Sequence, residues 1–220
     1  MSHIAVVGGH GNVARHLHPI LVAAGHTPVA LVRKDAYRAE LEALGAEVRL
    51  LDIEADDASA FATAFDGCDA VVFAAGGGAD GNVQRKRTVD LEGSLKSIAG
   101  ARQAGITRFV QLSAIGVDDA LPDDTAEVWK AYVEAKRDAD VALRDSGLDW
   151  TIIRPGALTD DDALGRVQLA EHVTRGSIPR ADVAAVLAAV LDSEAAVGRQ
   201  WELVSGNTPV DDAVALAVTG

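Results

Sequence analysis

Short apolar runs alternate with amphipathic segments along most of this chain, and this alternation limits its fold more than any other feature. Runs that read as buried strands lie at residues 3–7, 28–32, 47–51, 69–74, 108–112 and 150–153. Segments with helical spacing separate them, at residues 12–24, 37–44, 57–65, 89–104 and 125–146. This pattern predicts parallel strands joined by right-handed helical crossovers, in a sheet covered on both faces.

We therefore expect an α/β fold, a doubly wound Rossmann-type sheet of strand order 3-2-1-4-5-6. A seventh strand is expected near residues 201–204. The tail after Arg154 is less regular, with a loop through residues 160–162 and helices at 180–191 and near 209–218. A length of 220 residues fits a single domain, residues 1–220, in which about 155–180 and 197–220 form a small C-terminal substrate-binding region.

Composition argues against several classes of partner. Twenty Lys and Arg against thirty-three Asp and Glu give a net charge of −13, so the average surface repels nucleic acid and anionic lipid. No apolar run approaches the roughly 20 residues of a membrane span, and no signal peptide is evident. The single Cys68 cannot form an internal disulfide, and the histidines lack paired ligand spacing. We expect a soluble, cytoplasmic monomer or homodimer that binds a small molecule, with no structural metal.

The turn between the first strand and the first helix carries the glycine spacing of a phosphate-binding loop. Gly8 permits a tight turn, Gly11 lets the backbone approach a pyrophosphate, and a small residue follows at position 14. Free N–H groups at the helix start face the anion. The turn opens a full βαβ series, so phosphate binding is favoured over a simple tight turn. The predicted cofactor contacts here are Gly8, His10, Gly11, Asn12 and Val13.

Residues that follow the next three strands complete the predicted cofactor site. Arg33 and Lys34 stand where an acidic residue would bind the ribose 2′-hydroxyl of NAD, which favours the 2′-phosphate of NADP. The alternative is a pair of solvated surface cations. Asp52 and Ile53 are placed to meet the adenine. The segment after the fourth strand would allow close approach to the ribose and pyrophosphate, through Ala74, Ala75 and Gly76.

A candidate catalytic group follows the fifth strand. Tyr132 and Lys136 are four residues apart on a predicted helix, so both side chains project from one face. A lysine ammonium favours a nearby phenolate, so we expect the pKa of Tyr132 to fall from about 10 toward neutrality. Ser113 ends the strand at the same edge, where its hydroxyl would hold a carbonyl oxygen. The alternative is a chance spacing and a serine that terminates a strand.

Taken together, these segments resemble the atypical branch of the short-chain dehydrogenase/reductase superfamily, which includes NmrA-like and epimerase-like NAD(P)-binding proteins. The matching segments span nearly the whole chain, at residues 8–14, 89–93, 108–113, 132–136, 149–156 and 180–184. The resemblance implies that Lys136 also holds the nicotinamide ribose, that Tyr132 transfers a proton and that Ser113 positions the substrate oxygen. It also implies that Pro155 and Gly156 abut the nicotinamide.

Two features depart from the superfamily's usual pattern. Asp90 stands where many members carry an asparagine that supports a proton-relay water, and the C-terminal region is short for binding a nucleotide sugar. The resemblance implies an NADP(H)-dependent oxidoreductase that transfers a hydride to or from a small carbonyl, quinone or related acceptor. Two alternatives stay open, a non-catalytic NADP(H)-binding redox sensor and an epimerase or dehydratase that recycles its cofactor.

Overall fold

The computed structural model describes residues 1–78 and 81–219, so Gly220, the last residue of the predicted substrate-binding region, lies outside the described residues. The strands are β1 (His3–Val7), β2 (Thr27–Val32), β3 (Glu47–Leu50), β4 (Ala70–Phe73), β5 (Arg108–Leu112), β6 (Asp149–Pro155), β7 (Ala157–Thr159), β8 (Arg166–Ala170), β9 (Ser177–Pro179), β10 (Arg199–Ser205) and β11 (Thr208–Pro209). The α-helices are α1 (Asn12–Ala23), α2 (Arg38–Ala43), α3 (Ala58–Ala64), α4 (Val83–Arg85), α5 (Glu92–Gln103), α6 (Glu127–Arg144), α7 (Arg180–Leu191) and α8 (Val210–Ala217).

The main sheet has the strand order that the alternation predicts. Its order is β11-β8-β10-β6-β5-β4-β1-β2-β3, and the six strands from β3 to β6 pair in parallel, which confirms the doubly wound order. The expected seventh strand is β10, which pairs in parallel with β6 and sets Trp201 opposite Ile153. The carboxyl ends of these strands therefore meet at one edge, where ligands bind in such folds.

The segment after Arg154 is more regular than the sequence suggested. β8 pairs antiparallel with β10 and extends the sheet, while β7 and β9 form a small parallel pair beside it. Strand β8 alternates buried Val167 and Leu169 with exposed Arg166 and Gln168, which is the pattern of a strand with one solvated face. The expectation of irregular structure here was wrong, because it rested on the continuous apolar runs of strands buried on both faces.

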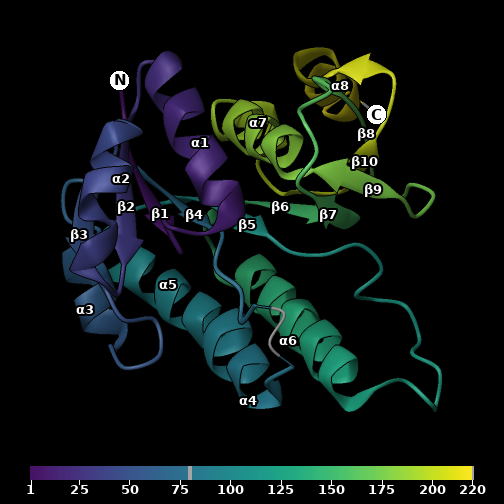
Figure 1. The fold of residues 1–220 in the computed structure, drawn as a ribbon, viewed down its shortest axis with the longest axis horizontal. Coiled ribbons are helices and arrows are strands. Elements are labelled where there is room, and N and C mark those ends of the chain that lie inside the picture. Colours follow the sequence, from purple (N-terminus) through teal and green to yellow (C-terminus); the bar gives the residue numbers. More distant parts are fainter. Residues whose placement is uncertain (79–80, 220) are drawn as a thin grey trace.

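Helices cover both faces of the sheet, as Figure 1 shows, with α1, α7 and α8 on one side and α3, α5 and α6 on the other. On the first side α1 packs against α7, and Leu17, Leu21 and Leu187 are fully buried. The second core is more aromatic and buries Phe61, Phe65, Phe73 and Phe109. These two layers explain why the central strands are apolar without alternation. Within the described residues, no helix has the length and apolar character needed to cross a bilayer.

The helix that precedes β5 differs from its prediction in a way that affects the site. It begins at Val83 instead of near Val89, and its segment Lys86–Leu91 is a π-helix that leads into α5. Apolar spacing indicated only the later turns, because the first turn is polar and its start depends on Asn82, whose side chain accepts a hydrogen bond from the backbone N–H of Arg85. Isolated π-helical turns occur frequently at functional sites. Here the turn buries Lys86 and Asp90.

Candidate cofactor-binding and catalytic site

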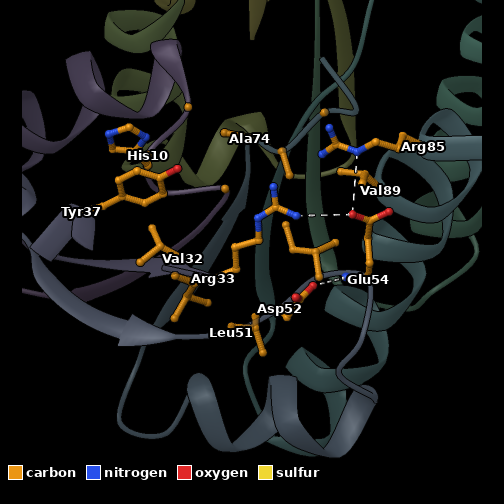
Figure 2. A pocket seen from close by; sticks show the side chains of 16 residues that line it. His10, Val32, Arg33, Tyr37, Leu51, Asp52, Glu54, Ala74, Arg85 and Val89 are labelled. Atoms are coloured by element: carbon orange, nitrogen blue, oxygen red, sulfur yellow. Dashed lines mark hydrogen bonds and ion pairs between the residues drawn. The ribbon is translucent and has the colours of Figure 1, made fainter. Parts of the chain in front are cut away.

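A cleft of about 250 Å³ opens where β1, β2, β3 and β4 end (Figure 2). It is lined by most of the residues predicted to bind a dinucleotide, namely Gly8, His10, Gly11, Arg33, Asp52, Ile53, Ala74, Ala75 and Gly76. It is also lined by residues that the sequence did not single out, namely Leu31, Val32, Tyr37, Leu51, Glu54, Arg85 and Val89. The glycine-rich turn and the ends of the neighbouring strands therefore face one shared space.

The glycine-rich turn has room and donors for an anion. Gly8 has a φ of +80°, and a Cβ at this position would lie 2.7 Å from the Cα of Ala75, so only glycine fits. Gly11 precedes α1, and within the part of the chain that the structure describes no side chain caps this helix. By contrast, the seven-residue helix α3 is capped by Asp57. The first N–H groups of α1 are thus left for a ligand, which fits the pyrophosphate of a dinucleotide.

His18 supports this turn from behind. It lies on α1, is fully buried, and its Nε2 is 2.7 Å from the carbonyl oxygen of Gly9. Burial lowers the pKa of His18, so the ring is neutral near pH 7, and Nε2 must carry the hydrogen that this carbonyl accepts. The imidazole therefore fixes the peptide between the two ends of the predicted phosphate loop.

Charged side chains meet on the side of the cleft that faces the end of β2. Arg33 lies 3.8 Å from Oε2 of Glu54, and Arg85 of α4 lies 3.7 Å from the same oxygen. Figure 2 shows the two guanidinium groups reaching Glu54 from different elements. Thr88 donates a hydrogen bond of 2.7 Å to the other oxygen of this carboxylate. Lys34 is exposed and does not line the cleft.

Rings and apolar groups complete this end of the cleft. The rings of His10 and Tyr37 stack in parallel with centroids 3.7 Å apart (Figure 2). Ile53 and Val89 add apolar surface, while the carboxylate of Asp52 accepts the backbone N–H of Glu54 at 2.9 Å. A planar base with an apolar face and a polar edge suits such a lining.

Tyr132 and Lys136 lie on α6, and Lys136 is held by a fully buried carboxylate. Nζ of Lys136 donates to the carbonyl of Leu112 at 3.0 Å and forms an ion pair with Asp90 at 3.3 Å. Asp90 also accepts the backbone N–H of Gly77 at 2.9 Å. Burial favours a lower pKa for Lys136, but Asp90, Tyr132 and Asp140 outweigh it and raise that pKa. The lysine is therefore charged, and its charge is largely balanced within the protein.

The expected lowering of the pKa of Tyr132 was wrong. Burial raises the pKa of this phenol above its ordinary value, and Asp90 and Asp140 raise it further, while only Lys136 opposes them. The spacing of Tyr132 and Lys136 revealed the favourable cation but not the carboxylate that neutralises it. Two more side chains flank the ring: Nζ of Lys86 lies 5.5 Å from its centroid, and the ring of Trp129 is 5.3 Å away.

Ser113 is buried at the end of β5, and its hydroxyl proton is already engaged. Its Oγ donates to Asp140 at 2.8 Å. Asp140 also accepts hydrogen bonds from Gln111 at 2.7 Å and from Nε of Arg154 at 2.9 Å. In this arrangement the serine oxygen offers lone pairs to a ligand and no proton.

The remaining predicted residues lie at the ends of β6 and at the start of α1. Pro155 and Gly156 are buried, and Gly156 donates its N–H to Leu203 of β10 at 2.8 Å. They do not line the cleft described above. Asn12 and Val13 form the first turn of α1, where the side chain of Asn12 accepts a hydrogen bond from Arg15 at 3.3 Å.

Comparison with known proteins identifies the family of this chain. The model of a family described as NAD(P)H-binding matches residues 8–194. An uncharacterized sugar epimerase, YhfK, of Bacillus subtilis (strain 168) is 37% identical over 212 residues, which cover 96% of this chain and 98% of that protein. A putative NAD-dependent epimerase/dehydratase from Bacillus halodurans superposes with a TM-score of 0.91 at 38% identity, over 98% of this chain and 100% of the other. The oxidoreductase ylbE from Lactococcus lactis gives a TM-score of 0.86 at 26% identity, over 99% and 97%. The chain therefore belongs to the NAD(P)H-binding family, within the atypical branch of the short-chain dehydrogenases/reductases.

Proposed function

We propose that this protein is an NADP(H)-dependent oxidoreductase that reduces a small carbonyl, quinone or related acceptor. The observation that carries the proposal is the state of Tyr132, which lies beside the buried Lys136–Asp90 pair. Because burial raises the pKa of this phenol, it is protonated at neutral pH. A neutral phenol can donate a proton, which is the role that reduction of an acceptor requires.

The chain's own residues supply the acid and hold its surroundings. Tyr132 donates its proton to the oxygen that becomes an alkoxide, and the positive charge of Lys136 stabilises the phenolate left behind. Asp90 and the carbonyl of Leu112 hold the lysine in place. Ser113 donates its hydroxyl hydrogen to Asp140, so its oxygen can accept a hydrogen bond from a donor group at the site. NADPH, when bound, supplies the hydride.

NADP is preferred over NAD in this proposal because of the charges at the end of β2. Arg33 and Arg85 line the same cleft as the glycine-rich turn. A guanidinium forms paired, charge-assisted hydrogen bonds to a phosphate, and the 2′-phosphate of NADP lies near the end of the second strand in this fold.

The test is the Tyr132→Phe variant, assayed with NADPH against a panel of carbonyls, quinones and flavins. We expect turnover to be lost, since the phenol proton is gone, while the Kd for NADPH measured by fluorescence changes less than about twofold. Circular dichroism and the melting temperature serve as controls for folding. If Tyr132→Phe reduces an acceptor of the wild-type protein at an unchanged rate, the role of Tyr132 is refuted.

An epimerase or dehydratase that recycles its cofactor is the second candidate, favoured by the similarity to the B. subtilis sugar epimerase and the B. halodurans epimerase/dehydratase. It uses the same tyrosine and lysine. Cofactor that remains bound through purification and shows no net oxidation during turnover would favour it over a reductase. A non-catalytic redox sensor has less support, because such a sensor has no need of the Tyr132 and Lys136 pair.

A further inference from the structure

We propose that Glu54 is an internal counter-ion for a two-arginine 2′-phosphate site, and that it limits how strongly the chain prefers a phosphorylated dinucleotide. The inference rests on the proposed function, because it concerns the adenosine end of the same cofactor. It assigns roles to Glu54 and Arg85, neither of which stands next to the glycine-rich turn in the sequence.

The carboxylate of Glu54 lies between cations that come from separate elements. Glu54 follows β3, Arg33 follows β2, and Arg85 ends α4, so three separate elements bring their charges to one side of the cleft (Figure 2). One oxygen of Glu54 is anchored by Thr88, and the other faces both guanidinium groups. The carboxylate is therefore fixed between two cations that would otherwise face the cleft together.

The ion pairs of Arg33 and Arg85 with Glu54 are loose. Their N–O distances are 3.8 and 3.7 Å, whereas Arg15 meets Glu40 at 3.0 Å on the outer surface. A well-formed charge-assisted hydrogen bond is shorter, at about 2.7–2.9 Å. The side chains of Arg33, Glu54 and Arg85 are also 49%, 32% and 31% exposed. A ligand can therefore displace Glu54 from these two contacts without breaking a tight or fully buried pair with that carboxylate.

The charge of Glu54 also changes the balance between the two arginines and a bound 2′-phosphate. Two arginines match a phosphate dianion only when no further anion stands beside them, and Glu54 adds such an anion. An unphosphorylated ribose has hydroxyl groups that can donate to a carboxylate, so the same glutamate does not oppose it. Glu54 should therefore weaken binding of the phosphorylated ligand and leave binding of the unphosphorylated ligand unchanged. Arg85 should strengthen binding of the phosphorylated ligand.

The experiment measures Kd by calorimetry on the full chain with adenosine 2′,5′-bisphosphate and with 5′-AMP, which differ only in the 2′-phosphate. For Glu54→Gln we expect bisphosphate binding about fivefold tighter, the effect of one exposed like-charge contact, with 5′-AMP changed less than about twofold. Glutamine keeps the acceptor that Thr88 uses. For Arg85→Gln we expect bisphosphate binding at least about tenfold weaker, again with 5′-AMP little changed.

Arg87→Gln is the matched control, because Arg87 lies only two residues from Arg85, is 72% exposed and pairs with Glu92 outside the cleft. It should change neither Kd. The inference is overturned if Glu54→Gln leaves bisphosphate binding unchanged or weaker, or if Arg85→Gln weakens both ligands equally.

NADPH and NADH are titrated against the wild-type protein in parallel. If the wild type binds NADPH but Glu54→Gln leaves bisphosphate binding unchanged, this inference is overturned and the proposed function still stands. Failure of the wild type to bind either dinucleotide would remove both.

Discussion

The predicted adenosine end and the predicted catalytic end of the site hold their charges in opposite ways. At the adenosine end, Arg33 and Arg85 are partly exposed and meet Glu54 at 3.8 and 3.7 Å. At the predicted catalytic end, Lys136 and Asp90 are 6% and 0% exposed, and each also forms a hydrogen bond with a backbone group. The ion pairs at the first end are loose and partly exposed, while the pair at the second is buried. Binding preference and folding stability should therefore respond to different substitutions.

The largest effect should come from Lys136→Met, which leaves the buried carboxylate of Asp90 without its cation. Removing one partner of a buried ion pair costs about 3–5 kcal/mol of unfolding free energy, whereas an exposed pair contributes about 1 kcal/mol or less. Arg33→Met is the matched variant at the adenosine end, and it should change stability by less than about 1 kcal/mol. Urea unfolding of both variants tests this. Equal losses would show that the two ends do not differ in the way described.

A smaller effect is expected at Tyr132 when Asp90 is replaced by asparagine. Asp90 raises the pKa of this phenol, so Asp90→Asn should lower it relative to the parent protein. The chain has two tyrosines, and Tyr37→Phe in both proteins leaves Tyr132 as the only phenol to titrate. Absorbance of the phenolate as a function of pH gives the value. If the pKa of Tyr132 stays constant or rises in Asp90→Asn, then Asp90 does not raise the pKa of this phenol in the parent protein.

The smallest effect is expected at His18, which lies behind the glycine-rich turn. Burial lowers its pKa below the ordinary 6.5, so on acidification the unfolded chain takes up this proton first. The contribution of His18 to stability is therefore complete above pH 6.5 and is lost as the pH falls through its folded pKa. Unfolding free energies at pH 7.5 and about 5.5 should differ less in His18→Gln than in the parent. An identical pH dependence would contradict the assignment.

The sheet and the phosphate turn were predictable because their signals are local. Continuous apolar runs specify strands buried on both faces, and the Gly8 and Gly11 spacing specifies a tight turn before a helix. The same reasoning missed β8, where a short alternating strand follows an acidic loop. Its pairing with β10 depends on a distant segment, so periodicity alone gave a weak indication.

The candidate site was less predictable than the fold, because its charges come from separate elements. Glu54 is one acidic residue among many in the sequence, and only folding places it between Arg33 and Arg85. The pKa of Tyr132 was misjudged for the same reason, since Asp90 lies on a different helix and the burial of the phenol has no sequence signal. Spacing within one helix shows which groups are neighbours, but not the net charge around them.

The π-helical segment Lys86–Leu91 has a consequence for how this fold tolerates change in length. Immediately after it, Gly93 and Gly100 of α5 press against Ile53 and Phe61, where an added Cβ would come within 2.5 and 2.6 Å. A π-turn holds about one residue more than an α-turn. Asp90, within the π-helical segment, pairs with Lys136, and both glycines of the following helix keep their close contacts. Deleting one residue here would rotate Asp90 relative to the two glycines, so the length of this segment couples the Lys136–Asp90 pair to the packing of α5.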